Sequence, residues 1–272
     1  MNKRGEFDKI IKDIKNVKIQ GARNIARAAL RAYRLIPTKI SKRKLLFSRP
    51  TEPMMEKVLN LAEKTKNYSE ISKHFDSAQK EINKNVLKLI GKNDVVFTHC
   101  HSTNVVNALI YARKKKFFEV YNTETRPLFQ GRKTARELRR AGIKVTIFVD
   151  SAAAIAIEKE NRRDKIYADK IFLGADALLK NGIINKVGSK LISEIANLHK
   201  VPVYIIADSW KFTKKKIPIE QRKLNEVWDN APKNIKIKNP AFEFVDKKYI
   251  SGIVTELGVQ KYRGFVKSIT IR

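Results

Sequence analysis

The sequence predicts an α/β protein in which a helical N-terminal part is followed by a Rossmann-like parallel sheet with helices on both faces. Two observations lead to this fold class. Residues 1–91 show helical spacing of apolar residues without a strand pattern, and residues 92–272 alternate short apolar runs with helical stretches. Strands that are apolar along their whole length are typical of a parallel sheet covered on both faces. We therefore expect a helical N-terminal domain, 1–91, and a Rossmann-like α/β domain, 92–272.

The N-terminal part is predicted to be helical because its apolar residues recur every three or four positions. The alanine-rich stretch favours a helix further, since alanine has the highest helix propensity. The predicted helical segments cover 10–17, 22–32, 54–61 and a lysine-rich stretch that ends near Gly91, with Pro37, Pro50 and Pro53 between them.

Six runs after Asp94 are predicted to be the strands of the sheet. Each is rich in β-branched or aromatic residues. They are VVFTHC (95–100), FFEVYNT (117–123), KVTIFVD (144–150), KIFLGAD (170–176), VPVYIIADS (201–209) and GIVTE (252–256). At or just beyond the end of each run lie polar or reactive residues, namely Cys100 and Ser102, Glu124 and Arg126, Asp150 and Ser151, Asp176, Asp208 and Ser209, and Thr255 and Glu256. Ligands of open parallel sheets bind beyond the carboxyl ends of the strands, so we expect these side chains to converge on one crevice.

Composition limits where the protein works. No apolar run approaches the about 20 residues that a membrane-spanning helix needs. The first ten residues contain Glu6 and Asp8 where an export signal would be apolar. One cysteine allows no internal disulfide. We therefore expect a cytoplasmic protein with no membrane partner.

The formal net charge of +31 exceeds what a phosphate-binding site needs. Most of the surplus must lie on the surface, where it favours weak, nonspecific attraction to RNA; a biased genome composition or a salty cytoplasm would produce the same charge. Neither zinc-finger spacing nor an aromatic RNA-binding signature is present, which argues against a dedicated nucleic-acid function.

Two residues are candidates for acid–base chemistry. Cys100 follows an apolar strand between two histidines and is either a buried small hydrophobe or a thiol that acts as base or nucleophile. Asp176 lies in GADALLKNGIINKVGS (174–189) and is either a plain loop residue or a desolvated carboxylic acid that holds a proton near neutral pH.

Other residues are candidates for anion binding. Arg49 and Arg126 each precede a proline, which biases them toward extended backbone, and each could clamp a phosphate. Gly21 and Ala22 precede a helix, whose free N–H groups attract anions. Asp150, Asp208 and Glu256 are interpreted instead as caps of the helices after their strands.

Several segments together resemble one family, which unites the regulatory subunits of eukaryotic translation initiation factor 2B with sugar-phosphate isomerases. They are THCHS (98–102), ETRPLFQGRKTARELRRAGIKVT (124–146), VDSAAA (149–154), GADALLKNGIINKVGS (174–189), ADSWKF (207–212) and NPAFEFV (239–245). The cysteine and aspartate are similar to the pair in archaeal ribose-1,5-bisphosphate isomerases and in methylthioribose-1-phosphate isomerases, whereas the regulatory subunits generally do not keep both.

The resemblance implies an aldose–ketose isomerase that forms ribulose 1,5-bisphosphate in nucleotide salvage. It implies that Cys100 moves the proton at carbon 2, that Asp176 protonates the ring oxygen, and that neither a metal nor an organic cofactor is required. It also implies a homo-oligomer, dimer or hexamer, and activation by AMP as in some family enzymes. The ligand-binding positions it implies are Gly21, Ala22, Arg49, Ser102, Asn185 and Lys186.

This sequence departs from the family pattern at Gln20, where the isomerases usually carry arginine. The alternatives are a methylthioribose-1-phosphate isomerase, a noncatalytic regulatory subunit like those of the initiation factor, and an RNA-binding role driven by charge.

Overall fold

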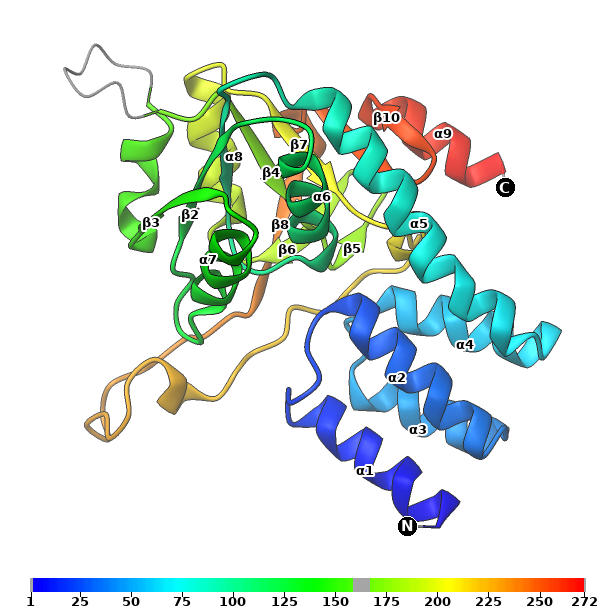
Figure 1. Cartoon of the computed structure of the whole chain (residues 1–272). Coiled ribbons are helices and arrows are strands. Elements are labelled where there is room, and N and C mark those ends of the chain that lie inside the picture. The colour runs from blue at the N-terminus through cyan, green and yellow to red at the C-terminus, as the bar shows by residue number, and fades with distance from the viewer. Residues whose placement is uncertain (1, 159–166, 272) are drawn as a thin grey trace.

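The computed structural model describes residues 2–158 and 167–271. Its N-terminal part is helical, which confirms the prediction (Figure 1). The helices there are α1 (Lys3–Lys15), α2 (Ala22–Leu35), α3 (Lys39–Ser48), α4 (Pro53–Thr65) and α5 (Tyr68–Leu89). They enclose a core of their own, built from residues such as Ile14, Ile25 and Leu45, each fully buried. Removal of such apolar side chains from water contributes most of the free energy that stabilises the packing of these helices.

The chain after α5 forms a seven-stranded sheet of order β10-β9-β7-β4-β1-β2-β3, in which only β10 runs antiparallel to its neighbour. Its strands are β1 (Val95–Thr98), β2 (Glu119–Thr123), β3 (Lys144–Phe148), β4 (Lys170–Leu173), β7 (Val203–Ile206), β9 (Gly252–Thr255) and β10 (Gly258–Gln260). The six predicted strands are all present. Counted along the chain, the parallel strands lie in the Rossmann order 3-2-1-4-5-6, so β1 and β4 flank the point where the strand order reverses.

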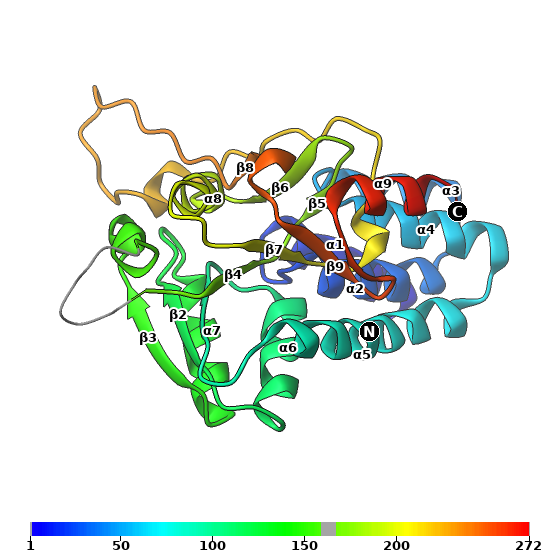
Figure 2. The same ribbon diagram turned by 90° about the horizontal axis from the view of Figure 1, so that it is seen from above.

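Helices cover both faces of this sheet, as predicted (Figure 2). The C-terminal half of α5, α6 (Thr103–Arg113) and α7 (Gln130–Arg140) pack on one face and bury Ile82, Leu109 and Leu138. On the other face lie α8 (Ser189–Leu198), α9 (Tyr262–Ile271) and the short helix η1 (Asp150–Ala156). The two apolar clusters lie on opposite sides of the strands, which explains why the strands are apolar throughout.

A second sheet of order β5-β6-β8 was not predicted. It consists of β5 (Ala177–Leu178), β6 (Gly182–Lys186) and β8 (Phe242–Asp246), all antiparallel. Because β6 pairs with a segment far along the chain, local sequence patterns carried no signal for it. The segment that directly follows Asp176 is strand β5 of this sheet, where it pairs with β6.

The predicted division at residue 91 stays a prediction. α5 ends just before it, and the helix joins the two parts: Phe75 is buried in the helical core, whereas Ile82 and Val86 are buried against the sheet. Within the described residues, no helix is long and apolar enough to cross a membrane.

Candidate functional site

A cavity opens at the carboxyl ends of β1 and β4, where the strand order reverses. The loop after β1 contributes Cys100 and Ser102, and the loop after β4 contributes Asp176. Gly21, Ala22, Arg49, Asn185 and Lys186 line the same cavity. Of the residues predicted to be catalytic or ligand-binding, all but Arg126 line this cavity, although most lie far apart along the chain. The predicted convergence of every strand end is wrong: the polar residues at the ends of β2, β3, β7 and β9 do not line the cavity, and Ser209 after β7 bonds Glu256 after β9 instead.

Cys100 is held in an unusual backbone conformation, with φ of 67°. Its N–H donates to Oγ1 of Thr125 at 3.0 Å, and its carbonyl accepts from Oγ1 of Thr134 at 2.8 Å. A left-handed backbone is uncommon for a residue with a Cβ and persists where the surroundings enforce it. These two bonds fix the backbone of Cys100, which lines the cavity and belongs to none of the apolar core clusters of the described residues.

Burial sets the protonation of both central residues. It raises the pKa of the Cys100 thiol to about 11, although the charge of Lys186 acts in the opposite direction. Burial also raises the pKa of Asp176, opposed by Lys211, Lys186 and Arg49. The aspartate therefore has the character of a carboxylic acid that can supply a proton, and the thiol needs a cation beside it to ionise.

Gly174 allows the two loops to approach each other. A Cβ at this position would lie 2.6 Å from the Oγ of Ser102, closer than real Cβ contacts. Ser102 therefore packs directly against the end of β4, and glycine is required there. On β6, Asn185 donates to Oγ of Ser189 at 2.8 Å, which anchors it beside the same loop.

Three cations stand around Asp176. Lys186 is 7% exposed and Lys211 is 5% exposed, and the ammonium of Lys211 donates to the carbonyl of Ala175 at 2.7 Å. Arg49 forms an ion pair with Glu220 at 2.8 Å. Buried cations attract anionic ligands strongly because little water screens them. The cavity therefore suits a ligand that carries phosphate.

Sequence reasoning missed several cavity residues, among them Glu52, Gln130, Lys211 and Arg222. The sequence offered an indication that Lys211 lies near the site, since it follows closely on the predicted strand end at Asp208 and Ser209. Glu52 lies within a few residues of Arg49 but gave no pattern of its own. Glu220 and Arg222 lie in the long segment between Thr213 and Ala241, which Figure 1 shows as an extended loop.

Gly21 begins α2 with φ of 82°, and no side chain caps the helix there. The first N–H groups of α2 are thus free to meet an anion. Gln20, which stands at the position where the resemblance expects arginine, turns its amide back to donate to the carbonyl of Val17 at 2.9 Å.

Arg126 does not reach the cavity, contrary to the expectation that it converges there with Arg49 and Lys186. Its N–H donates to Asp150 at 2.6 Å, and its guanidinium donates to the carbonyl of Val227 at 3.3 Å and lies over the ring of Phe129. These contacts hold the side chain on the surface, so we leave it out of the candidate site.

Asp208 caps the short helix η2 (Ser209–Lys211) by accepting from the N–H of Trp210, as predicted. The cap interpretation is wrong for the other two carboxylates. Asp150 accepts the N–H groups of Thr125 and Arg126 across the strand ends, and Glu256 accepts the N–H and O–H of Ser209.

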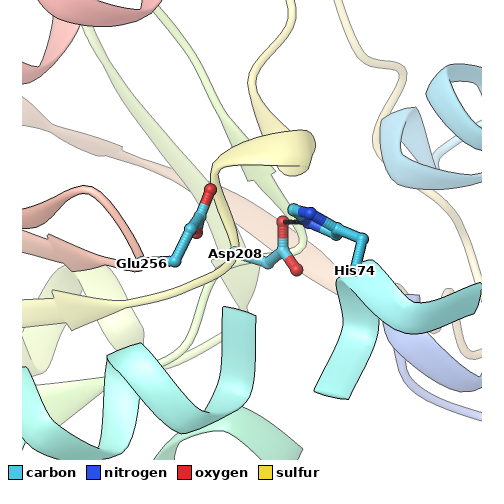
Figure 3. Close-up of side chains that lie close together, drawn as sticks. All are labelled: His74, Asp208 and Glu256. Atoms are coloured by element: carbon cyan, nitrogen blue, oxygen red, sulfur yellow. Dashed lines mark hydrogen bonds and ion pairs between the residues drawn. The ribbon is translucent and has the colours of Figure 1, made fainter. Parts of the chain in front are cut away.

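His74, Asp208 and Glu256 form a second cluster, shown in Figure 3, whose potential metal-ligand atoms lie within 4.8 Å of one another. His74 bonds Asp208 at 3.1 Å and stacks on Trp210 at 3.5 Å between ring centroids. Asp208 also accepts from the N–H of Trp210, and both carboxylate oxygens of Glu256 accept from Ser209. The arrangement is explained by packing of α5 against η2, and we assign it no metal.

Known proteins resemble this chain over most of its length. The model of the initiation factor 2 subunit family matches residues 43–262. Ribose 1,5-bisphosphate isomerase of Methanocaldococcus jannaschii is 34% identical over 97% of this chain and 99% of its own. The chain belongs to the initiation factor 2 subunit family. The corresponding isomerase of Pyrococcus furiosus is 33% identical over 93% of this chain and 90% of its own.

Solved structures of this family share the fold. Translation initiation factor eIF-2B of Pyrococcus horikoshii superposes with a TM-score of 0.81 at 24% identity, over 94% of this chain and 96% of its own. The 5-methylthioribose 1-phosphate isomerase of the same organism superposes with a TM-score of 0.79 at 22% identity, over 97% of this chain and 87% of its own. At such identities the likeness establishes the fold and leaves the activity to the site.

Proposed function

We propose that this member of the initiation factor 2 subunit family is an isomerase that converts ribose 1,5-bisphosphate to ribulose 1,5-bisphosphate. The observation that carries the proposal is that Cys100 and Asp176 open on one cavity together with Arg49, Lys186 and Lys211. An acid, a base and a set of buried cations are what ring opening of a phosphorylated sugar requires. The family members at 32–34% identity that are named ribose 1,5-bisphosphate isomerase support this choice of substrate.

The chemistry divides between the two central residues. Asp176, as the acid, protonates the ring oxygen, and the bond between that oxygen and carbon 1 breaks. Cys100, as the thiolate, removes the proton from carbon 2, so that an enol forms between carbons 1 and 2. Asp176 then accepts the proton of the oxygen on carbon 2 while the Cys100 thiol returns its proton to carbon 1, which completes the ketose.

We further propose that the enzyme acts in nucleotide salvage in the cytoplasm, that it assembles as a homo-oligomer, and that AMP activates it. The net charge of +31 gives it only a weak attraction to RNA, which declines steeply with salt because it depends on displaced counterions. An RNA complex that survived high salt would instead favour a nucleic-acid function.

Incubation of the purified protein with ribose 1,5-bisphosphate tests the proposal, with the ketose product followed by NMR. 5-Methylthioribose 1-phosphate serves as the competing substrate. We expect conversion of the bisphosphate with the higher kcat/KM. Failure to convert either sugar, with and without AMP, would support the noncatalytic regulatory alternative.

A further inference from the structure

Glu52 is a buried carboxyl group that the proposed mechanism does not use. It precedes α4 directly, and its backbone carbonyl accepts from the N–H groups of Met55 and Glu56, while its side chain forms no cap. The residue is only 3% exposed and lines the cavity of Cys100 and Asp176. A carboxyl group this deep ordinarily has hydrogen-bond partners on both oxygens.

Three buried polar atoms of cavity-lining residues are unsatisfied. Within residues 2–158 and 167–271, Glu52 Oε2, Arg49 Nε and Gln130 Oε1 find no hydrogen-bond partner, although all three residues line the cavity. Leaving such a group unpaired in a protein interior costs about 1–3 kcal/mol. Several unpaired atoms around one hollow indicate that a polar ligand supplies the missing partners.

A purely structural role as the partner of Arg49 does not account for Glu52. Its Oε1 lies 3.7 Å from Arg49 Nε, which is an ion-pair distance and not a hydrogen bond. Arg49 forms its short contact, 2.8 Å, with Glu220 on the long loop. Among the described residues, Arg49 Nε and Glu52 Oε2 therefore both remain available to a third group.

We propose that Glu52 is a ligand-binding residue whose Oε2 contacts an oxygen of the bound sugar phosphate between Arg49 and Asp176. This inference rests on the proposed function for the nature of the ligand. A carboxylic acid can donate a hydrogen bond to a phosphate or hydroxyl oxygen, whereas a carboxylate repels phosphate. The residue therefore acts in its uncharged form.

The surroundings agree with an uncharged carboxyl. Burial raises the pKa of Glu52 to about 8, and Asp176 acts in the same direction whenever it is ionised. The cations Arg49 and Lys211 oppose that shift, and Glu220 adds to it. Burial therefore favours the protonated side chain at neutral pH, and we expect it to ionise as the pH rises past about 8. Ionisation places a negative charge beside the bound phosphate, so affinity for the ligand falls as the pH rises through this range.

Binding of ribulose 1,5-bisphosphate measured by calorimetry between pH 7 and pH 9.5 tests the inference, because the second pKa of its phosphate monoesters, about 6, lies below this range. Glu52→Gln keeps the size and the hydrogen-bonding groups but cannot ionise. Glu52→Ala removes them. Glu56→Gln is the matched control, since Glu56 lies in the first turn of the same helix and pairs with Lys215 outside the cavity.

We expect the unmodified protein and Glu56→Gln to lose affinity about tenfold per pH unit above pH 8, and Glu52→Gln to show no such loss. Glu52→Ala should bind roughly tenfold more weakly already at pH 7, for want of one hydrogen bond. An alkaline loss that persists unchanged in Glu52→Gln, or unmodified affinity in a folded Glu52→Ala, overturns the inference. Because binding is measured, a protein that binds but never isomerises would instead contradict the proposed function.

Discussion

The backbone N–H of Cys100 donates a 3.0 Å hydrogen bond to the hydroxyl oxygen of Thr125, a residue with no exposed surface. Thr125 is itself held by Asp150, whose carboxylate accepts the Thr125 N–H at 2.9 Å. The loop after β2 and the segment after β3 therefore position the thiol that follows β1. Three adjacent strand ends act together on one residue of the cavity.

Thr125→Val removes the acceptor for this N–H while keeping the shape of the side chain. We expect the free energy of unfolding to fall by about 1–3 kcal/mol, because a buried donor loses its partner. The displaced thiol should lower kcat by about 10- to 100-fold with little change in KM. Thr270→Val, on the exposed side of α9, should leave both kcat and stability unchanged. Unaltered kcat in Thr125→Val contradicts the positioning role.

Arg49→Ala and Arg126→Ala form a matched pair, since only Arg49 lines the cavity. Loss of Arg49 should weaken binding of ribulose 1,5-bisphosphate by about 1–3 kcal/mol, the usual penalty when a charged hydrogen-bond partner is lost. Arg126→Ala should bind as the unmodified protein does. Calorimetric titration of both variants checks this prediction, and equal losses in the two would show that the ligand lies elsewhere.

The pKa of Cys100, raised to about 11, predicts how the rate depends on pH. A thiol must ionise before it removes a proton, so kcat should rise with pH by up to about tenfold per pH unit on the acid side of that pKa. Lys186→Met removes the cation that lowers this pKa and should move the rise to higher pH. Deuterium at carbon 2 of the substrate should slow the reaction, which establishes that proton removal limits kcat. A flat profile with a full isotope effect would exclude Cys100 as the base.

His99 predicts an acid-side loss of stability. It is buried, bonded to Thr123 and to the carbonyl of Val187, and burial lowers its pKa to about 4. Between about pH 6.5 and 4 the unfolded chain binds a proton that the folded chain does not. Stability should therefore fall by up to about 3 kcal/mol as the pH is lowered through this window.

Urea unfolding of His99→Gln across the same pH range checks that prediction. The variant should lose most of this pH dependence, whatever its absolute stability. His199→Gln, just after the end of α8, should keep the pH dependence of the free energy of unfolding of the unmodified protein. An unchanged pH dependence in His99→Gln would assign the acid sensitivity to other groups, such as His101, whose pKa burial also lowers to about 4.

The sequence predicted the six strands because each carries a local signal, and it predicted that the ends of β1 and β4 meet because the strand ends of a parallel sheet lie at one edge. It did not predict that the polar ends of the other four strands stay outside the cavity, because their side-chain directions depend on tertiary contacts. It could not predict β6 pairing with β8, because that contact joins segments remote in the chain. It placed Arg126 in the crevice from the proline that follows it. A proline restricts the backbone and says nothing of where the side chain points, and Phe129 and Val227 hold it outside.

Glu52 was missed for a related reason. A glutamate before a helix is an ordinary surface residue in sequence terms, whereas here it is buried near the charged groups of Glu220 on the long loop and of Asp176 after β4. The same loop also pairs with Arg49, so the contacts of this part of the cavity are set by tertiary packing rather than by any motif.

The proton-transfer roles of Cys100 and Asp176 are tested most directly by the turnover of ribose 1,5-bisphosphate in Cys100→Ser and Asp176→Asn, measured together with calorimetric binding of ribulose 1,5-bisphosphate. Each variant removes one proton-transfer group and no phosphate contact. We predict that both lose isomerisation entirely and bind the bisphosphate within about threefold of the unmodified protein, since only interactions formed in the transition state are lost. Near-normal turnover in Cys100→Ser, with the ligand still bound, would contradict the assignment of Cys100 as the base.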